Sequence, residues 1–265
     1  MADFVAAAHA FLSPPPLSPI FAPGGALETL NEDVTLIVSL MLVLFLADAI
    51  GTRLLGINEN ARWFFVHAIA NAVSAVAAFP DLRRALWEDP VHCFSGKSHT
   101  MVANSAVAAA HLYHVAAFKL RAGDIFHHLM FTSILCGLAI PYKNQGGVAN
   151  NFGCFILSGL PGGIDYCMLV AVKQGAMPKL AEKRWNAAIN TWVRAPAMAV
   201  YGFIGWQAYL LGTYQVPTPF LFIVTILHFT NGQHYGAEAV AGYAKWKLLG
   251  EMEAKKGGGQ GKKGQ

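Results

Sequence analysis

Three titratable side chains open an apolar stretch near the middle of the chain, which reads GDIFHHLMFTSILCGLAI over residues 123–140. On a helix, residues three and four apart are neighbours, so Asp124 can contact either His127 or His128. A carboxylate that orients an imidazole is the minimal part of a general acid–base device. We therefore take Asp124, His127 and His128 as the candidate catalytic group. In water the same pattern would more often be structural, with Asp124 near the positive end of the helix dipole.

The solvent around these residues decides their interpretation, and the composition indicates a membrane. Hydrophobic residues make up 55% of the chain, charged residues make up 13%, and the mean hydropathy is +0.41. Soluble globular proteins contain about 25% charged residues. Ionisable side chains inside a bilayer are costly and usually functional, so a membrane setting favours a functional role for the candidate catalytic group.

Seven apolar stretches reach or approach the length of about 20 residues that a membrane-spanning helix needs. They are residues 34–51, 63–79, 98–118, 124–140, 147–172, 191–212 and 217–249. We therefore predict an all-α membrane protein with about seven transmembrane helices. The chain divides into a Pro-rich N-terminal segment (1–33), one transmembrane domain (34–249) and a Lys/Gly-rich tail (250–265). The fifth stretch contains LPGGID, which predicts a helix broken within the membrane.

Further polar side chains lie within the predicted spans. His111 and His114 share one helix face because they are three residues apart, Asp165 follows the Pro-Gly-Gly sequence, and Asn231 and His234 lie in the last span. We expect these five side chains to face the interior of the bundle and to bind substrate there. The four cysteines show no paired spacing, and the histidine motifs are too few for a di-iron centre. We predict no metal and no resident cofactor.

The positive charges predict an orientation, because Lys and Arg accumulate on the cytoplasmic side of a membrane. With seven spans and a cytosolic C-terminus, all 19 basic residues face the cytosol except Arg83, Arg84, Lys97 and Lys143. Anionic lipid head groups explain the net charge of +4, so no nucleic-acid partner is expected. The chain ends in KKGQ, which has the KKxx spacing of a dilysine retrieval signal. We predict an endoplasmic-reticulum membrane protein with a lumenal N-terminus.

The segments DIFHHLMFT, LPGGIDY and FTNGQHYG together resemble the TLC-domain family, which includes the ceramide synthases. The resemblance covers residues 62–246. It implies that six of the helices form a TLC-type barrel around an internal cavity for an acyl chain. It also implies that His127 and His128 are catalytic, with Asp124 as their orienting group. Two departures favour the broad family over its catalytic branch: Thr132 follows His128 by four residues instead of three, and Asp165 stands alone where ceramide synthases have a His-Asp and Ser-Asp cluster.

Two classes of function stay open at this point. The first is an acyltransferase that uses the histidine pair on an acyl thioester such as acyl-CoA, with a membrane lipid or fatty acyl chain as partner. The second is a non-enzymatic protein that binds or sorts lipids. A small-molecule transporter is a further alternative, because a broken helix beside an intramembrane carboxylate is typical of transporter substrate sites. A homo-oligomer or a larger membrane assembly fits either class. A retinal-binding protein is excluded by the lack of lysine between residues 217 and 244.

Overall fold

The structure is a computed structural model that describes residues 29–120 and 122–260. Within these ranges the chain forms seven helical rods and no strand, so the prediction of an all-α protein is confirmed. Four rods are built from more than one labelled helix, with π-helical segments marked η. The rods are α3 (Leu30–Arg53); α4 (Glu59–Arg83) with η1 (Arg84–Glu88); α5 (Val102–Ala117); α6 (Ala122–His127) with η3 (His128–Cys136) and α7 (Gly137–Ala139); α8 (Gly147–Cys154) with η4 (Phe155–Gly159) and α9 (Leu160–Lys173); α10 (Lys179–Ile189) with η5 (Asn190–Arg194) and α11 (Ala195–Leu211); and α12 (Thr218–Gln260).

Four helical segments are long and apolar enough to cross a membrane. In the described part of the chain they are Leu30–Arg53, Glu59–Glu88, Ala122–Ala139 and Gly147–Lys173. Helix α5 has 16 residues, which corresponds to about 24 Å and is shorter than a hydrocarbon core of about 30 Å. The protein therefore has four candidate spans, and the membrane crossing of the other three rods stays a prediction.

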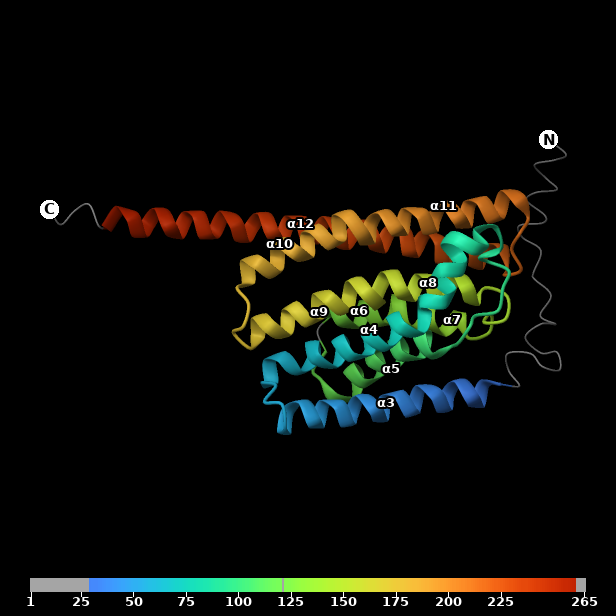
Figure 1. Ribbon diagram of the computed structural model, residues 1–265, viewed down its shortest axis with the longest axis horizontal. Coiled ribbons are helices and arrows are strands. Elements are labelled where there is room, and N and C mark those ends of the chain that lie inside the picture. Colours follow the sequence, from blue (N-terminus) through green and yellow to red (C-terminus); the bar gives the residue numbers. More distant parts are fainter. Residues whose placement is uncertain (1–28, 121, 261–265) are drawn as a thin grey trace.

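The rods lie along the long axis of the molecule, and α12 extends past the other helices (Figure 1). At one end, which we call the Asn58 end, the loop 54–58 meets the loop 174–178. The Asn58 Nδ2 donates to the Lys173 carbonyl at 2.7 Å. At the other end, the Phe94 end, the backbone N–H of Gln215 donates to the Phe94 carbonyl at 3.0 Å, and Thr213 Oγ1 donates to the Val91 carbonyl at 2.6 Å. These two bundle ends correspond to the predicted cytosolic and lumenal sides.

The fifth rod is not broken at its Pro-Gly-Gly sequence, which corrects the sequence prediction. It runs from Gly147 to Lys173, and Pro161 lies in the first turn of α9 directly after the π-helical segment Phe155–Gly159. Proline removes a backbone donor and its ring clashes with the carbonyl four residues earlier. A π-helical turn widens the helix just before the proline, and such turns commonly absorb this distortion. The helix therefore continues without an unwound segment.

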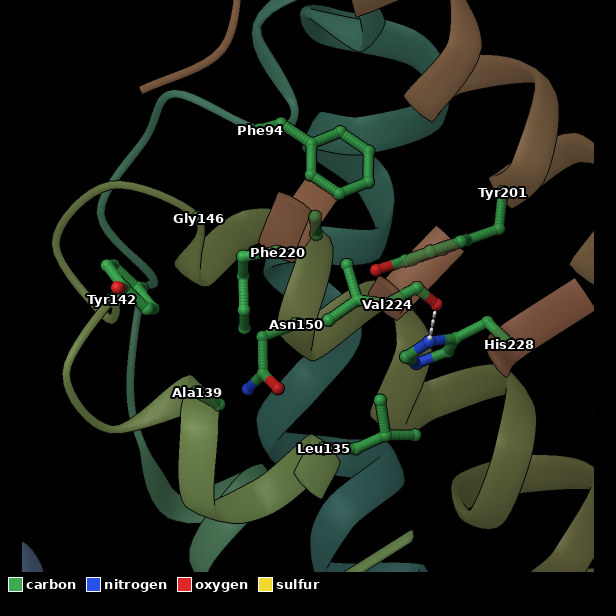
Figure 2. A pocket seen from close by; sticks show the side chains of 11 residues that line it. Phe94, Leu135, Ala139, Tyr142, Gly146, Asn150, Tyr201, Phe220, Val224 and His228 are labelled. Carbon is green, nitrogen blue, oxygen red and sulfur yellow. Dashed lines mark hydrogen bonds between the residues drawn. The ribbon is translucent and has the colours of Figure 1, made fainter. Parts of the chain in front are cut away.

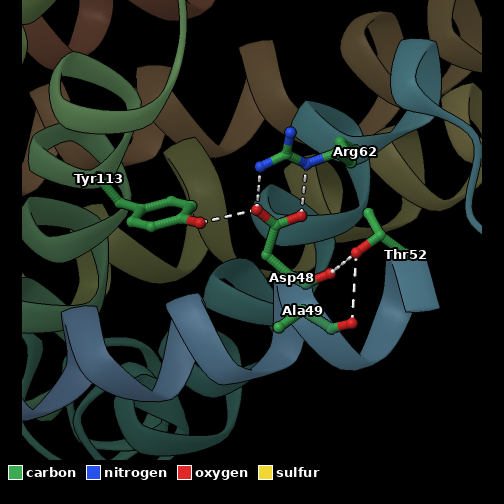
Figure 3. A network of polar contacts seen from close by, with 5 residues as sticks. All are labelled: Asp48, Ala49, Thr52, Arg62 and Tyr113. Atoms are coloured by element: carbon green, nitrogen blue, oxygen red, sulfur yellow. Dashed lines mark hydrogen bonds and ion pairs between the residues drawn. The ribbon is translucent and has the colours of Figure 1, made fainter. Parts of the chain in front are cut away.

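Helix α3 is held against the bundle by a buried carboxylate near its end (Figure 3). Asp48 accepts hydrogen bonds from Arg62 Nε at 2.8 Å, from Arg62 Nη2 at 2.5 Å and from the Tyr113 hydroxyl at 2.7 Å. The Asp48 side chain is 4% exposed. Because Arg62 comes from α4 and Tyr113 from α5, this one carboxylate joins three rods at the Asn58 end.

The largest apolar core lies toward the Phe94 end, among α8, α11 and α12. Phe94, Phe152, Met198, Tyr201 and Leu221 are all fully buried there. The outward faces of the rods are also apolar, and α3 exposes a row of large hydrophobic side chains. Extensive exposed apolar surface marks contact with a membrane or a partner, which agrees with the four candidate spans.

Candidate functional site

A cavity of about 550 Å³ lies inside the bundle. Its size falls within the range of about 300–1,000 Å³ that is usual for small-molecule sites. Every rod except α3 contributes to its wall. The lining residues are Trp63, Phe64, His67 and Asn71; Asn104, Val107, Ala110, His111 and His114; Gly123, Asp124, His127, His128, Leu135 and Cys136; Asn150, Gly153, Cys154, Leu157, Ser158, Gly162, Asp165, Tyr166 and Leu169; Arg194; and His228, Asn231 and Tyr235.

The chemical character of the wall changes along the cavity. Toward the Asn58 end the lining comes from the start of α4, the end of α5 and the start of α6, and it is rich in histidine. Toward the Phe94 end the lining mixes Leu135, Cys136, Cys154 and Leu157 with the polar side chains of Asn104, Asn150 and His228. The cavity thus has a histidine-rich end, which we call the polar end, and an end with fewer titratable groups, which we call the apolar end.

The apolar end closes on a much smaller pocket of about 20 Å³, which shares Leu135, Asn150 and His228 with the main cavity (Figure 2). A space of this size holds about one water molecule. His228 is fixed there because its Nδ1 donates to the Val224 carbonyl at 2.7 Å, and its ring stacks on Tyr201 with centroids 4.4 Å apart. The pocket therefore lies next to the Phe94 end of the cavity.

Five imidazole rings gather at the polar end. His111 Nε2 lies 3.2 Å from His127 Nε2, and His114 Nδ1 lies 3.0 Å from His128 Nε2. The rings of His111 and His128 also meet, with centroids 4.9 Å apart. His67 of α4 completes the group, with its centroid 6.1 Å from that of His111. We call these five rings the histidine cluster.

The direction of one hydrogen-bond chain in the histidine cluster follows from its ends. A carbonyl oxygen only accepts, so His111 Nδ1 donates to the Val107 carbonyl, at 2.7 Å. In a neutral ring the other nitrogen of His111 is then an acceptor, and His127 Nε2–H donates to it. His127 Nδ1 is left as an acceptor for the Tyr235 hydroxyl, which lies 3.2 Å away. Tyr235, His127 and His111 thus form a proton relay with a defined direction.

The second histidine of the pair is held differently. His128 Nε2 pairs with His114 Nδ1, while the Nδ1 of His128 is buried and has no hydrogen-bond partner among the described residues. Trp63 packs against His114 with ring centroids 3.5 Å apart and so fixes that side of the cluster. Asp124 lines the cavity and interacts electrostatically with both His127 and His128.

The structure brings most of the sequence-predicted site residues to one cavity. Asp124, His127, His128, His111, His114, Asp165 and Asn231 all line it. His234 does not line it, and its side chain is exposed beside the ring of Tyr235. Adjacent residues on a helix point about 100° apart, and Tyr235 shares a face with Asn231 because the two are four residues apart. Tyr235 therefore takes the place that was predicted for His234, while the chemical roles of the other residues stay predictions.

Three residues of the polar end were missed by the sequence analysis: His67, Arg194 and Tyr235. Arg194 had a usable signal, because an arginine in an apolar stretch of a membrane protein is a candidate functional residue. Tyr235 could have been found from its four-residue spacing to Asn231. His67 carried the same signal, because it is an ionisable residue in the predicted span 63–79, although only the packing of α4 against α5 brings it to His111.

A search among protein-family models, curated proteins and solved structures finds no match to this chain, so the function is argued from the site itself.

Proposed function

We propose that this protein is a membrane-embedded lipid-processing protein of the TLC-domain type, which transfers an acyl chain from an acyl thioester to a hydroxyl or amine acceptor. The observation that carries the proposal is the cavity, which is walled by six rods, is lined by Leu135 and Leu157 toward one end and is lined by the histidine cluster at the other. The hydrocarbon of the acyl chain lies toward Leu135 and Leu157, and the thioester lies at the histidine cluster. Acyl-CoA is the proposed co-substrate, and no metal or resident cofactor takes part.

The proton relay supplies the general base for this reaction. An acceptor that takes the place of the Tyr235 hydroxyl donates its proton to His127 Nδ1 as its oxygen or nitrogen attacks the thioester carbonyl. His127 becomes an imidazolium, which Asp124 stabilises electrostatically. Its Nε2–H stays hydrogen-bonded to His111 Nε2, which the Val107 carbonyl holds in place through the bond to Nδ1. The thiolate leaves, and the proton on His127 Nδ1 protonates it.

A non-enzymatic lipid-binding protein uses the same cavity but does not cleave the acyl thioester, and this difference separates it from the acyltransferase. The full chain in lipid nanodiscs is mixed with palmitoyl-CoA and a hydroxyl- or amine-bearing acceptor lipid, and the free thiol is measured together with the bound lipids by native mass spectrometry. We expect thiol release above that of empty nanodiscs. Retained lipid without thiol release would contradict the enzyme and favour the lipid-binding protein. The transporter alternative loses one of its two supporting observations, because the fifth rod is continuous, while Asp165 still lines the cavity.

The apolar end should set the acyl length. Leu157 is half-buried and lines the cavity, so Leu157→Trp should displace about three methylene groups of the longest chain that fits. Each buried methylene contributes about 0.8 kcal/mol, so the affinity for that chain should fall about sixty-fold while shorter chains bind as before. The measurement is competition between palmitoyl- and decanoyl-CoA. Leu129→Trp is the matched control, because Leu129 is 61% exposed and does not line the cavity. An equal loss for both chain lengths would contradict the assignment.

We also propose residence in the endoplasmic-reticulum membrane with the Asn58 end toward the cytosol. The basic charges support this orientation. Lys262 and Lys263 lie outside the described residues. Changing both to Ser should let a tagged protein move to the Golgi and plasma membrane while protease protection shows unchanged topology. Unchanged location of the double variant would reject the retrieval signal.

A further inference from the structure

A second polar group lines the cavity besides the histidine cluster. It consists of Arg194 from η5, Asn71 from α4 and Asp165 from α9. Each of the three has a buried polar atom with no hydrogen-bond partner among the described residues: Arg194 Nε, Asn71 Nδ2 and Asp165 Oδ1. Buried polar groups in proteins are almost always hydrogen-bonded, so three unsatisfied atoms on one cavity wall indicate a missing partner.

Arg194 is the strongest of these indications. Its Nη1 donates to Asn190 Oδ1 at 3.0 Å, but no carboxylate in the described part of the chain lies within ion-pair distance of the guanidinium. A buried charge without a counter-charge is strongly unfavourable. Asp165 is near enough to interact electrostatically with Arg194 without forming an ion pair. A bound anion would therefore satisfy the guanidinium.

Gly162 lets two nitrogen donors come close to the same stretch of backbone. A Cβ atom built on Gly162 would lie 2.9 Å from Asn71 Nδ2 and 3.6 Å from Arg194 Nη2. The two donors therefore lie on the same side of Gly162, and both residues line the cavity. Hydrogen bonds from nitrogen to oxygen are about 2.7–3.2 Å long, so the oxygens of one anionic group in the cavity can accept from both donors. The guanidinium fork matches carboxylate and phosphate oxygens.

We propose that Arg194 and Asn71 bind the anionic oxygens of an amphiphile's head group, either a fatty-acid carboxylate or a lipid phosphate, while Asp165 Oδ1 accepts from a neighbouring hydroxyl or protonated group of the same head group. This inference rests on the proposed function only in treating the cavity as a lipid site. Tyr235 contacts His127 and is also an electrostatic neighbour of Arg194. The anion site and the proton relay therefore belong to the same polar end of the cavity.

The test compares three ligands of one chain length on the full chain in nanodiscs of neutral lipid: palmitate, palmitoyl lysophosphatidate and hexadecanol. We expect at least one of the anionic ligands to bind about ten- to hundredfold more tightly than hexadecanol, as for a charge-assisted pair of hydrogen bonds. Tighter binding of palmitate would identify the head group as a carboxylate, and tighter binding of palmitoyl lysophosphatidate would identify it as a phosphate. Arg194→Gln should remove the preference and leave hexadecanol binding unchanged. A preference that survives this change would overturn the proposal.

Two further variants keep the test decisive. Gly162→Ala puts a methyl group 2.9 Å from Asn71 Nδ2, so the Asn71 amide must shift from its place beside Arg194. It should also lower the preference while leaving Arg194 in the chain, and it serves if Arg194→Gln does not fold. His127→Ala disables the proton relay and should keep the anionic preference, so loss of acyl transfer and loss of the anion site are separable. Inorganic phosphate that competes with lysophosphatidate at equal affinity would show a free-anion site and contradict the amphiphile.

Discussion

Replacing His127 by alanine should lower acyl transfer about 10²–10⁴-fold, because a positioned general base contributes about that factor. His127 is the middle member of the relay, so its removal breaks the hydrogen bond to His111 and the hydrogen bond from Tyr235 together. The measurement is the rate of thiol release from palmitoyl-CoA at saturating acceptor, together with lipid binding by native mass spectrometry. Binding should be retained, because the apolar end of the cavity is untouched.

The matched control is His234→Ala on the neighbouring helix, since His234 is exposed and does not line the cavity. It should leave the rate within a factor of about two, as expected for a surface substitution. His111→Gln tests the hydrogen bond that orients His127, because it keeps a polar side chain but removes the imidazole that accepts from His127 Nε2–H. If His127→Ala and His234→Ala had equal rates, the relay would have no part in catalysis.

Removing the Asp48 carboxylate should destabilise the protein by about 3–5 kcal/mol, the cost of breaking a buried ion pair from one side. Asp48→Ala leaves Arg62 and the Tyr113 hydroxyl without their shared acceptor and loosens α3 from the bundle. The measurement is the free energy of unfolding in mixed detergent micelles. The cavity is not lined by α3, so lipid binding by the folded fraction should persist.

An exposed ion pair of similar length provides the comparison. Arg83 Nε lies 2.8 Å from Glu88 Oε1, and both side chains are about half exposed. Glu88→Ala should cost less than about 1 kcal/mol, because solvent screens exposed pairs. Tyr113→Phe removes only one hydrogen bond to Asp48. Its cost in free energy of unfolding should fall between those of Glu88→Ala and Asp48→Ala. A value for Asp48→Ala as small as that for Glu88→Ala would show that α3 is held by its apolar contacts alone.

Composition and periodicity were enough to predict the helical class and the polar helix faces. Long apolar stretches with few charges can satisfy their backbone in a membrane only as helices or barrels. The stretches here are nearer in length to a spanning helix of about 20 residues than to a barrel strand of about 9–11 residues, so the all-α class follows from their length. The three-residue spacing of His111 and His114 likewise places these two side chains on one helix face. The spacing of Asp124 to His127 and His128 does the same in the next helix. Seven of the eight predicted site residues line the cavity for this reason.

The sequence alone determined, through local rules, which residues share a helix face. Only the tertiary structure decided how those faces meet. The continuity of the fifth helix depends on a π-helical turn that compensates Pro161, and propensity rules for proline do not contain such a turn. The hydrogen bond between His127 and Tyr235 joins residues 108 positions apart. Arg194 and Asn71 both come close to Gly162 where three rods pack together. Contacts between distant segments depend on the packing of whole helices, so local spacing predicts the members of the site but not their partners.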